Sequence, residues 1–99
     1  MGQLKTIWKR GALLRVSEIS TWYYDTMGVS AANHFLQGIN ETVQLLSKSP
    51  DIGVLDKRRS TSTIKYYSFV AHPKYKVVYY FNSRTIYIVT IHRTLMKNG

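Results

Sequence analysis

The first half of the chain places its apolar residues at the spacing of α-helices. A short run over residues 4–8 is compatible with a strand, and Gly11 follows it. From Ala12 onward the apolar positions recur every three or four residues. The first stripe consists of Ala12, Val16, Ile19 and Tyr23, widened by Leu13 and Trp22. The second stripe consists of Ala32, Phe35, Leu36, Ile39, Val43 and Leu46. The pattern predicts two helices, which together extend from about residue 12 to residue 49.

Turn-forming residues set the expected ends of these helices. Gly28 suits the left-handed position that ends a first helix, because glycine lacks a Cβ. Ser30 is a favourable N-cap for the second helix. Pro50 and Gly53 then stop that helix. Because the turn between the helices is short, we expect an antiparallel helical hairpin.

The second half of the chain changes to the period of two that is typical of β-strands. Three segments, over residues 64–70, 75–81 and 86–93, alternate side chains and are rich in β-branched and aromatic residues. One side of the last segment is expected to hold Ile86, Ile88, Thr90 and His92. The turns between the segments are short, which predicts an antiparallel meander.

The two halves of the chain together predict the fold class. The hairpin must cover one sheet face, since neither layer can bury its apolar side alone. The predicted fold is therefore α+β. A single domain over residues 1–99 has the order strand, helix, helix, three strands, with the α-hairpin on one face of a small, mainly antiparallel sheet.

The distribution of charge indicates a polyanionic partner. The 14 Lys and Arg residues exceed the five Asp and Glu residues and give a net charge of +9. All the acidic residues lie at or before Asp56, whereas from Lys57 onward the chain is basic and carries no carboxylate. A strong field of one sign attracts nucleic acid or an acidic protein segment, although it also keeps a protein soluble.

The predicted strands place basic and aromatic side chains on one sheet face. Lys65 and Lys76 fall on adjacent strands and are expected to project from the face without helices, together with Tyr67 and Tyr80. Such a face would suit single-stranded nucleic acid, because lysines can bind its phosphates and aromatic rings can stack on its bases. The alternative is that these tyrosines are structural, since tyrosine pairs well across strands.

Several classes of protein are excluded by what the sequence lacks. The chain has no cysteine, so it has neither a disulfide scaffold nor a thiolate metal site, and this suits a reducing compartment. Its three histidines are too widely separated for a zinc motif, and we expect no metal site. The longest strongly apolar run, residues 77–81, is too short to span a bilayer, and the N-terminus does not resemble a signal peptide.

The order of four segments resembles the RelE/ParE superfamily of bacterial toxins from type II toxin–antitoxin modules, which include plasmid stabilisation systems. The segments are Ile7-Trp8 with Ala12-Leu13, residues 24–28 with 31–35, residues 46–50 with Gly53, and residues 75–80 with 86–92. The resemblance implies a RelE/ParE-like toxin domain in the bacterial cytoplasm, with an acidic antitoxin as its partner. It also implies no cofactor, no small-molecule substrate and no membrane association.

This superfamily contains two activities. ParE-like members inhibit DNA gyrase by protein–protein contact, whereas RelE-like members cleave mRNA on the ribosome. For a nuclease, the resemblance implies catalytic roles for four residues: Lys65, Lys76, His92 and Arg93. However, Lys76 stands where the nucleases usually carry an arginine, and no tyrosine follows His92. A lysine loses the bidentate grip of arginine on a phosphate.

The long helical hairpin and the short tail after His92 resemble the ParE branch. A ParE-like gyrase inhibitor is therefore the first hypothesis. A ribosome-dependent mRNA endonuclease is the alternative, and a non-toxic basic nucleic-acid-binding relative is the third. Under each hypothesis one set of residues is expected to bind an acidic partner or nucleic acid: Arg58, Arg59, Lys65, Tyr67, Lys76, Tyr80 and Arg93.

Overall fold

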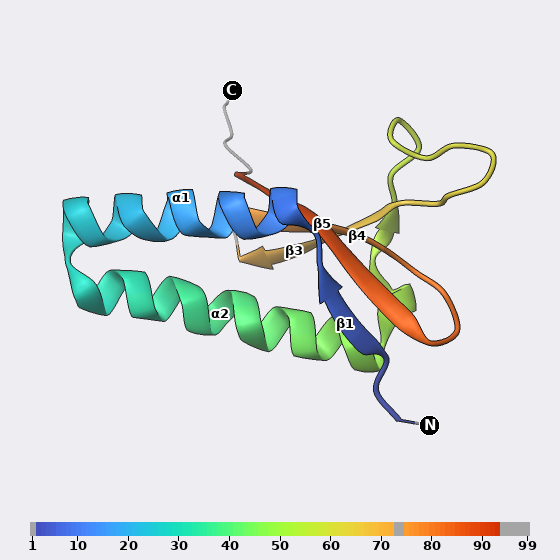
Figure 1. Ribbon diagram of the computed structural model, residues 1–99, viewed down its shortest axis with the longest axis horizontal. Coiled ribbons are helices and arrows are strands. Elements are labelled where there is room, and N and C mark those ends of the chain that lie inside the picture. The colour runs from blue at the N-terminus through green and yellow to red at the C-terminus, as the bar shows by residue number, and fades with distance from the viewer. Residues whose placement is uncertain (1, 73–74, 94–99) are drawn as a thin grey trace.

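The structure, a computed structural model, packs two helices on one face of a five-stranded sheet (Figure 1). It describes residues 2–72 and 75–93, apart from the side chain of His72. The elements in chain order are β1 (Lys5–Trp8), α1 (Arg10–Met27), α2 (Val29–Lys48), the 3₁₀ turn η1 (Pro50–Ile52), β2 (Val54–Leu55), β3 (Tyr67–His72), β4 (Tyr75–Phe81) and β5 (Thr85–Arg93).

The sheet has the strand order β1-β5-β4-β3-β2. The pairings β2–β3, β3–β4 and β4–β5 are antiparallel, and β1 runs parallel to β5 along the other edge. The predicted α+β class, the α-hairpin on one face and the mainly antiparallel sheet are confirmed. The strand β2 was not predicted, because a strand of two residues is too short to show a period. No helix in the described part of the chain is long and apolar enough to cross a membrane.

A single residue connects the two helices. Gly28 has φ +98° and ψ 176°, and its N–H donates to the carbonyl oxygens of Tyr23 and Tyr24 at the end of α1. This is not the left-handed helical conformation that was predicted, although its positive φ still favours glycine. The prediction that Ser30 caps α2 is wrong, because α2 begins at Val29 with Gly28 as its N-cap.

The core lies between the helical hairpin and the sheet. From α2 it takes Ala32, Phe35, Ile39, Val43 and Leu46, whereas α1 buries only Ala12 and Ile19 fully. The sheet contributes six buried side chains: Tyr75, Val77, Tyr79, Ile86, Ile88 and Ile91. Leu13, Trp22 and Leu36 are exposed, so the buried stripe on each helix is narrower than predicted.

A β-bulge in β5 reverses the alternation of its side chains. Val78 pairs with Thr90 while Tyr79 pairs with Ile88, so Val89 is an extra residue on β5. Ile88 and Ile91 therefore both face the helices, and His92 faces away from them. The prediction that His92 lies on the same side as Ile86 and Ile88 is wrong for this reason.

The strand β3 begins later than predicted. Residues 64–66 precede it, so Lys65 is not on a strand. Tyr67 pairs in register with Tyr79, and both rings pack on the helix-facing side. The prediction that Lys65 and Tyr67 share the open face is therefore wrong. The predicted turn after His72 involves Pro73, which lies outside the described residues.

Candidate functional site

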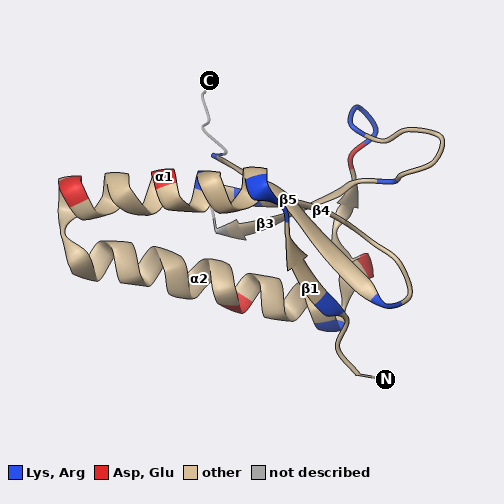
Figure 2. Ribbon diagram, viewed as in Figure 1, with Lys and Arg blue, Asp and Glu red and all other residues tan. Residues whose placement is uncertain are grey.

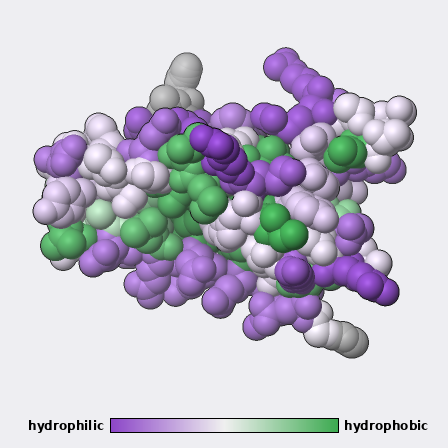
Figure 3. Space-filling model, in the orientation of Figure 1, coloured by the Kyte–Doolittle hydropathy of each residue, from purple (hydrophilic) through white to green (hydrophobic). Residues whose placement is uncertain are grey.

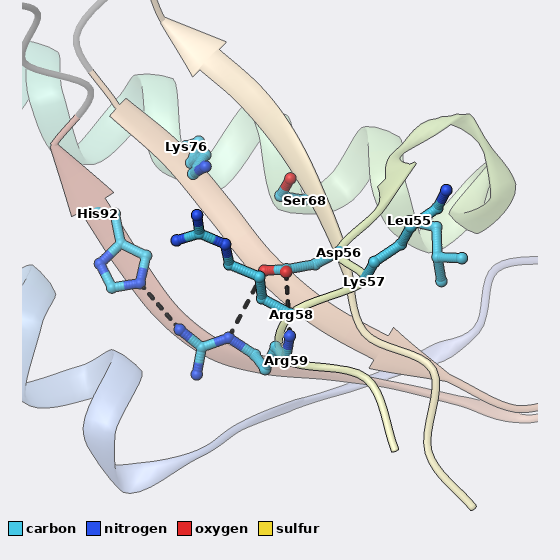
Figure 4. Close-up of a pocket in the computed structure, with 8 residues that line it drawn as sticks. All are labelled: Leu55, Asp56, Lys57, Arg58, Arg59, Ser68, Lys76 and His92. Carbon is cyan, nitrogen blue, oxygen red and sulfur yellow. Dashed lines mark hydrogen bonds and ion pairs between the residues drawn. The ribbon is translucent and has the colours of Figure 1, made fainter. Parts of the chain in front are cut away.

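A basic hollow lies on the face of the sheet away from the helices (Figure 4). Its volume is about 810 Å³. Lys76 on β4 and His92 on β5 are paired in register, and Ser68 comes from β3. Leu55 is the last residue of β2, and the other lining residues, 56–59, follow that strand. We call this hollow the basic pocket, and it is lined by Leu55, Asp56, Lys57, Arg58, Arg59, Ser68, Lys76 and His92.

A tight turn after β2 holds three consecutive basic residues at the pocket. The Asp56 carboxylate accepts from the Arg59 N–H at 3.1 Å, and the Ser60 hydroxyl donates to the Asp56 carbonyl oxygen at 2.7 Å. The Asp56 N–H donates to the Tyr66 carbonyl oxygen at 2.8 Å, which ties the turn to the start of β3. Aspartate and serine commonly stabilise turns through such side chain to backbone bonds. Residues 57–59 are thereby displayed on the loop after β2 (Figure 2).

Arg59 links Asp56 to His92. Its Nε lies 3.8 Å from the Asp56 Oδ2, and its Nη2 lies 3.1 Å from the His92 Nε2. A guanidinium can only donate, so the His92 Nε2 accepts and its proton is assigned to Nδ1. Burial lowers the pKa of His92 below its usual 6.5, and the charges of Arg59, Lys76 and Arg15 lower it further. The neutral form of His92 is therefore favoured.

The pocket carries an excess of positive charge. Asp56 is its only lining carboxylate, and Arg59 already pairs with it. Within the described residues, neither Arg58 nor Lys76 forms a salt bridge. Cations without acidic partners in a concave site attract anions. The geometry therefore favours an anionic ligand.

A row of three tyrosines lies on the same face of the sheet. The rings of Tyr80 on β4 and Tyr87 on β5 stack with their centroids 4.7 Å apart. Tyr66, just before β3, meets Tyr80 edge-on at 5.3 Å. The Nζ of Lys9 lies 5.8 Å from the centre of the Tyr87 ring. We call Tyr66, Tyr80 and Tyr87 the tyrosine row.

The structure brings together only part of the predicted site. Four of the predicted residues line the basic pocket: Arg58, Arg59, Lys76 and His92. Tyr80 shares their face but belongs to the tyrosine row.

The other three predicted residues lie elsewhere. Lys65 is exposed in the segment before β3 and does not line the pocket, and Tyr67 is partly buried against the core. Arg93 lies beside α1, with its guanidinium 5.6 Å from the centre of the Trp22 ring. The bulge at Val89 explains why Arg93 lies on the helix side of the sheet, because it turns residue 92 outward and residue 93 toward the helices.

Other residues at this face were not predicted. Lys57 and Asp56 were visible as part of a polar run, whose turn geometry could have been suspected from aspartate and serine four residues apart. Ser68, Tyr66 and Tyr87 carry no signal without the strand register. No group of acidic or histidine side chains in the described part of the chain is arranged to hold a metal ion.

Comparison with known proteins identifies the family. The sequence model of the family described as "ParE toxin of type II toxin-antitoxin system, parDE" matches residues 6–97. Among solved structures, the "Chromosomal ParDE TA system from P. aeruginosa" has a similar fold, with a TM-score of 0.71 at 19% sequence identity. That similarity covers 94% of this chain and 98% of the other. No curated protein matches this sequence. Because the family match spans most of the chain, the protein belongs to the ParE toxin family of type II toxin–antitoxin systems.

Proposed function

We propose that this protein is the toxin of a type II toxin–antitoxin module and that it inhibits DNA gyrase by protein–protein contact. Membership of the ParE toxin family supports the first part. The observation that carries the contact mechanism is the apolar surface around the turn of the helical hairpin, which extends beyond the sheet (Figure 1).

Four large apolar side chains are exposed around this turn. The exposed fractions are 47% for Trp22, 58% for Tyr24, 63% for Met27 and 57% for Val29. Apolar surface is visible at this end of the molecule (Figure 3). Exposed apolar patches commonly mark protein–protein interaction sites. Trp22 lines a separate hollow together with Glu18 and Arg93. We therefore call the other three residues, Tyr24, Met27 and Val29, the hairpin patch, and they support a mode of action that needs no catalytic residue.

The proposal includes an antitoxin that binds this chain. The similar structure from P. aeruginosa is named as a ParDE toxin–antitoxin system. An acidic partner would complement the net charge of +9. Co-expression with a small acidic protein encoded beside the toxin gene should yield a complex that copurifies and abolishes growth arrest. Arrest that persists despite complex formation would contradict neutralisation.

A supercoiling assay with purified gyrase tests the proposed target. The wild-type protein should inhibit supercoiling of relaxed plasmid, and the Met27→Glu/Val29→Glu variant should lose that inhibition. The matched control Ser17→Glu/Gln44→Glu places the same two charges on exposed polar positions of the same helices. Unchanged supercoiling at saturating wild-type protein would sink the gyrase proposal, and equal inhibition by all three proteins would remove the hairpin patch from it.

One observation favours mRNA cleavage as a second candidate function. A neutral His92 beside Lys76 and Arg59 combines a proton acceptor with cations for a phosphate oxyanion. Cleavage also needs an acid for the leaving oxygen, and the pocket contains no second histidine among its lining residues. Primer extension on translating mRNA tests this candidate. Cleavage by the wild type that is lost in Lys76→Ala/His92→Ala would favour the nuclease, and equal cleavage by both proteins would exclude these residues.

A further inference from the structure

The basic pocket and the tyrosine row share one face of the sheet. Lys76 and Tyr80 are four residues apart on β4 and both point away from the helices. A strand rises about 3.3 Å per residue, so the two side chains are separated by about 13 Å. His92 and Tyr87 lie opposite them on β5, on the same face. The basic pocket and the tyrosine row therefore lie at two ends of the same pair of strands, at a distance that a few nucleotides can span.

We propose that this helix-free face binds single-stranded nucleic acid, with a backbone phosphate in the basic pocket and bases against the tyrosine row. This property is independent of the contact with gyrase. Proteins that bind single strands combine a positive groove for the backbone with aromatic side chains for the bases.

The free cations of the pocket support the phosphate position. Arg58 is exposed and Lys76 is partly exposed, and within the described residues neither is paired with a carboxylate. Arg59 is held by Asp56 and His92, so it orders the pocket while Arg58 and Lys76 can turn toward a ligand. The Ser68 hydroxyl adds a neutral donor. A phosphate oxygen would meet complementary charge and hydrogen-bond donors here.

The tyrosine row favours a nucleic acid over an acidic peptide. Tyr66, Tyr80 and Tyr87 are all partly exposed, and Lys9 extends the row with a further cation. Carboxylates of a peptide would need the cations but not the rings. Bases need both a π-surface and a nearby group for the phosphate that links them. The juxtaposition of the two features therefore indicates bases joined by phosphates.

Fluorescence anisotropy with the purified full chain tests the proposal. The probes are oligothymidine and oligouridine of about 12 nucleotides, a duplex of the same length, and an abasic strand with the same number of phosphates. We expect either single strand to bind more tightly than the duplex, and the abasic strand to bind at least about fivefold more weakly. Tighter binding of the thymidine or of the uridine strand identifies DNA or RNA as the natural source of the phosphodiester.

Matched variants separate the pocket from diffuse attraction. Arg58→Gln/Lys76→Gln should weaken binding about tenfold and reduce the slope of log K against log salt by about 1.4, as for two phosphate contacts to a single strand. The control Lys48→Gln/Arg84→Gln removes two exposed charges elsewhere and should change affinity by less than about twofold. Circular dichroism verifies that both variants are folded.

Three results would overturn the proposal. The first is an equal loss of affinity in both variants, which indicates binding by net charge alone. The second is duplex or abasic binding as tight as that of the single strands. The third is displacement of the oligonucleotide by polyglutamate of equal charge at equal concentration, which makes the face a site for an acidic protein. Inhibition of gyrase is measured separately, so it can fail while nucleic-acid binding holds, or the reverse.

Discussion

At the scale of single residues, Tyr79 anchors the chain between α2 and β2. Its side chain is fully buried, and its hydroxyl donates to the Pro50 carbonyl oxygen at 2.6 Å and accepts from the Gly53 N–H at 3.1 Å. A Cβ at residue 53 would collide with this hydroxyl, which explains the glycine there. Loss of the hydroxyl would leave two backbone groups of η1 and its exit without a partner.

Tyr79→Phe should therefore destabilise the protein by about 1–3 kcal/mol. Urea denaturation at pH 7 measures this change. Tyr24→Phe is the control, because Tyr24 is exposed, and it should alter stability by less than about 0.5 kcal/mol. Equal stability of the wild type and Tyr79→Phe would show that water replaces both hydrogen bonds at no cost.

The same residue gives a prediction at alkaline pH. Burial raises the pKa of Tyr79 to about 12, against 10.0 for an exposed tyrosine. The folded state therefore keeps the proton that the unfolded state releases above pH 10. The stabilisation is complete below pH 10 and is lost as the pH rises toward 12. Stability measured from pH 9 to 11.5 should fall less steeply in Tyr79→Phe than in the wild type, and parallel curves would contradict this assignment.

His92 gives a prediction near neutral pH. Its pKa is lowered by burial and then by Arg59 and Lys76, so the unfolded state binds a proton more readily than the folded state. The contribution of neutral His92 to the free energy of unfolding is present above pH 6.5 and is lost as the pH falls below that value. NMR titration of the ring protons should give a pKa below 6.5 that rises in Lys76→Ala. Lys48→Ala, which removes an exposed charge at the end of α2, should leave it unchanged. An identical rise in both variants would mean that general charge, not the pocket, controls His92.

At the scale of elements, the turn of the helical hairpin rests on the conformation of one glycine. Gly28 has φ +98°, which side chains with a Cβ rarely adopt. Gly28→Ala should destabilise the protein by about 1–3 kcal/mol. Gly38 lies inside α2 with open space where a Cβ would stand, so Gly38→Ala should stabilise it by up to about 1 kcal/mol. The two thermal unfolding midpoints should move in opposite directions, and a shift of the same sign would contradict the role of the turn.

The elements also show what the sequence could and could not predict. The helical hairpin and the antiparallel meander followed from long, periodic apolar stripes. The side-chain directions on β5 could not be predicted, because the extra residue Val89 shifts the alternation and no glycine or proline in the sequence marks the position of the bulge. On β3 the alternation of aromatic residues was predicted correctly, but Tyr67 lies on the helix side of the sheet. Its pairing with Tyr79, which faces the helices, determines which of the alternating β3 side chains pack inward. Of the pocket, charge was sufficient to predict Arg58, Arg59 and Lys76, and the family resemblance added His92.

At the scale of the whole molecule, two surfaces are suited to two kinds of partner. The hairpin patch is apolar and extends beyond the sheet, whereas the basic pocket lies on the helix-free face (Figures 1 and 4). The helices and the core separate these surfaces. One chain could therefore contact a protein through the first surface while it holds a nucleic acid strand through the second.

This arrangement has a cost in self-repulsion that salt should relieve. The net charge is +9, and the described residues form only the pairs Arg15–Glu18 and Arg59–Asp56. Raising NaCl from about 20 to 500 mM shortens the Debye length to a few ångströms and should raise stability in urea by about 0.5–1 kcal/mol. Arg58→Gln/Lys76→Gln should gain less from salt than Lys48→Gln/Arg84→Gln, although both variants lose two charges. That difference follows because the first pair is crowded around one pocket and the second is dispersed. The same response to salt in both variants would show that the charges of the pocket do not repel one another. It would also remove the electrostatic argument that the pocket binds an anion.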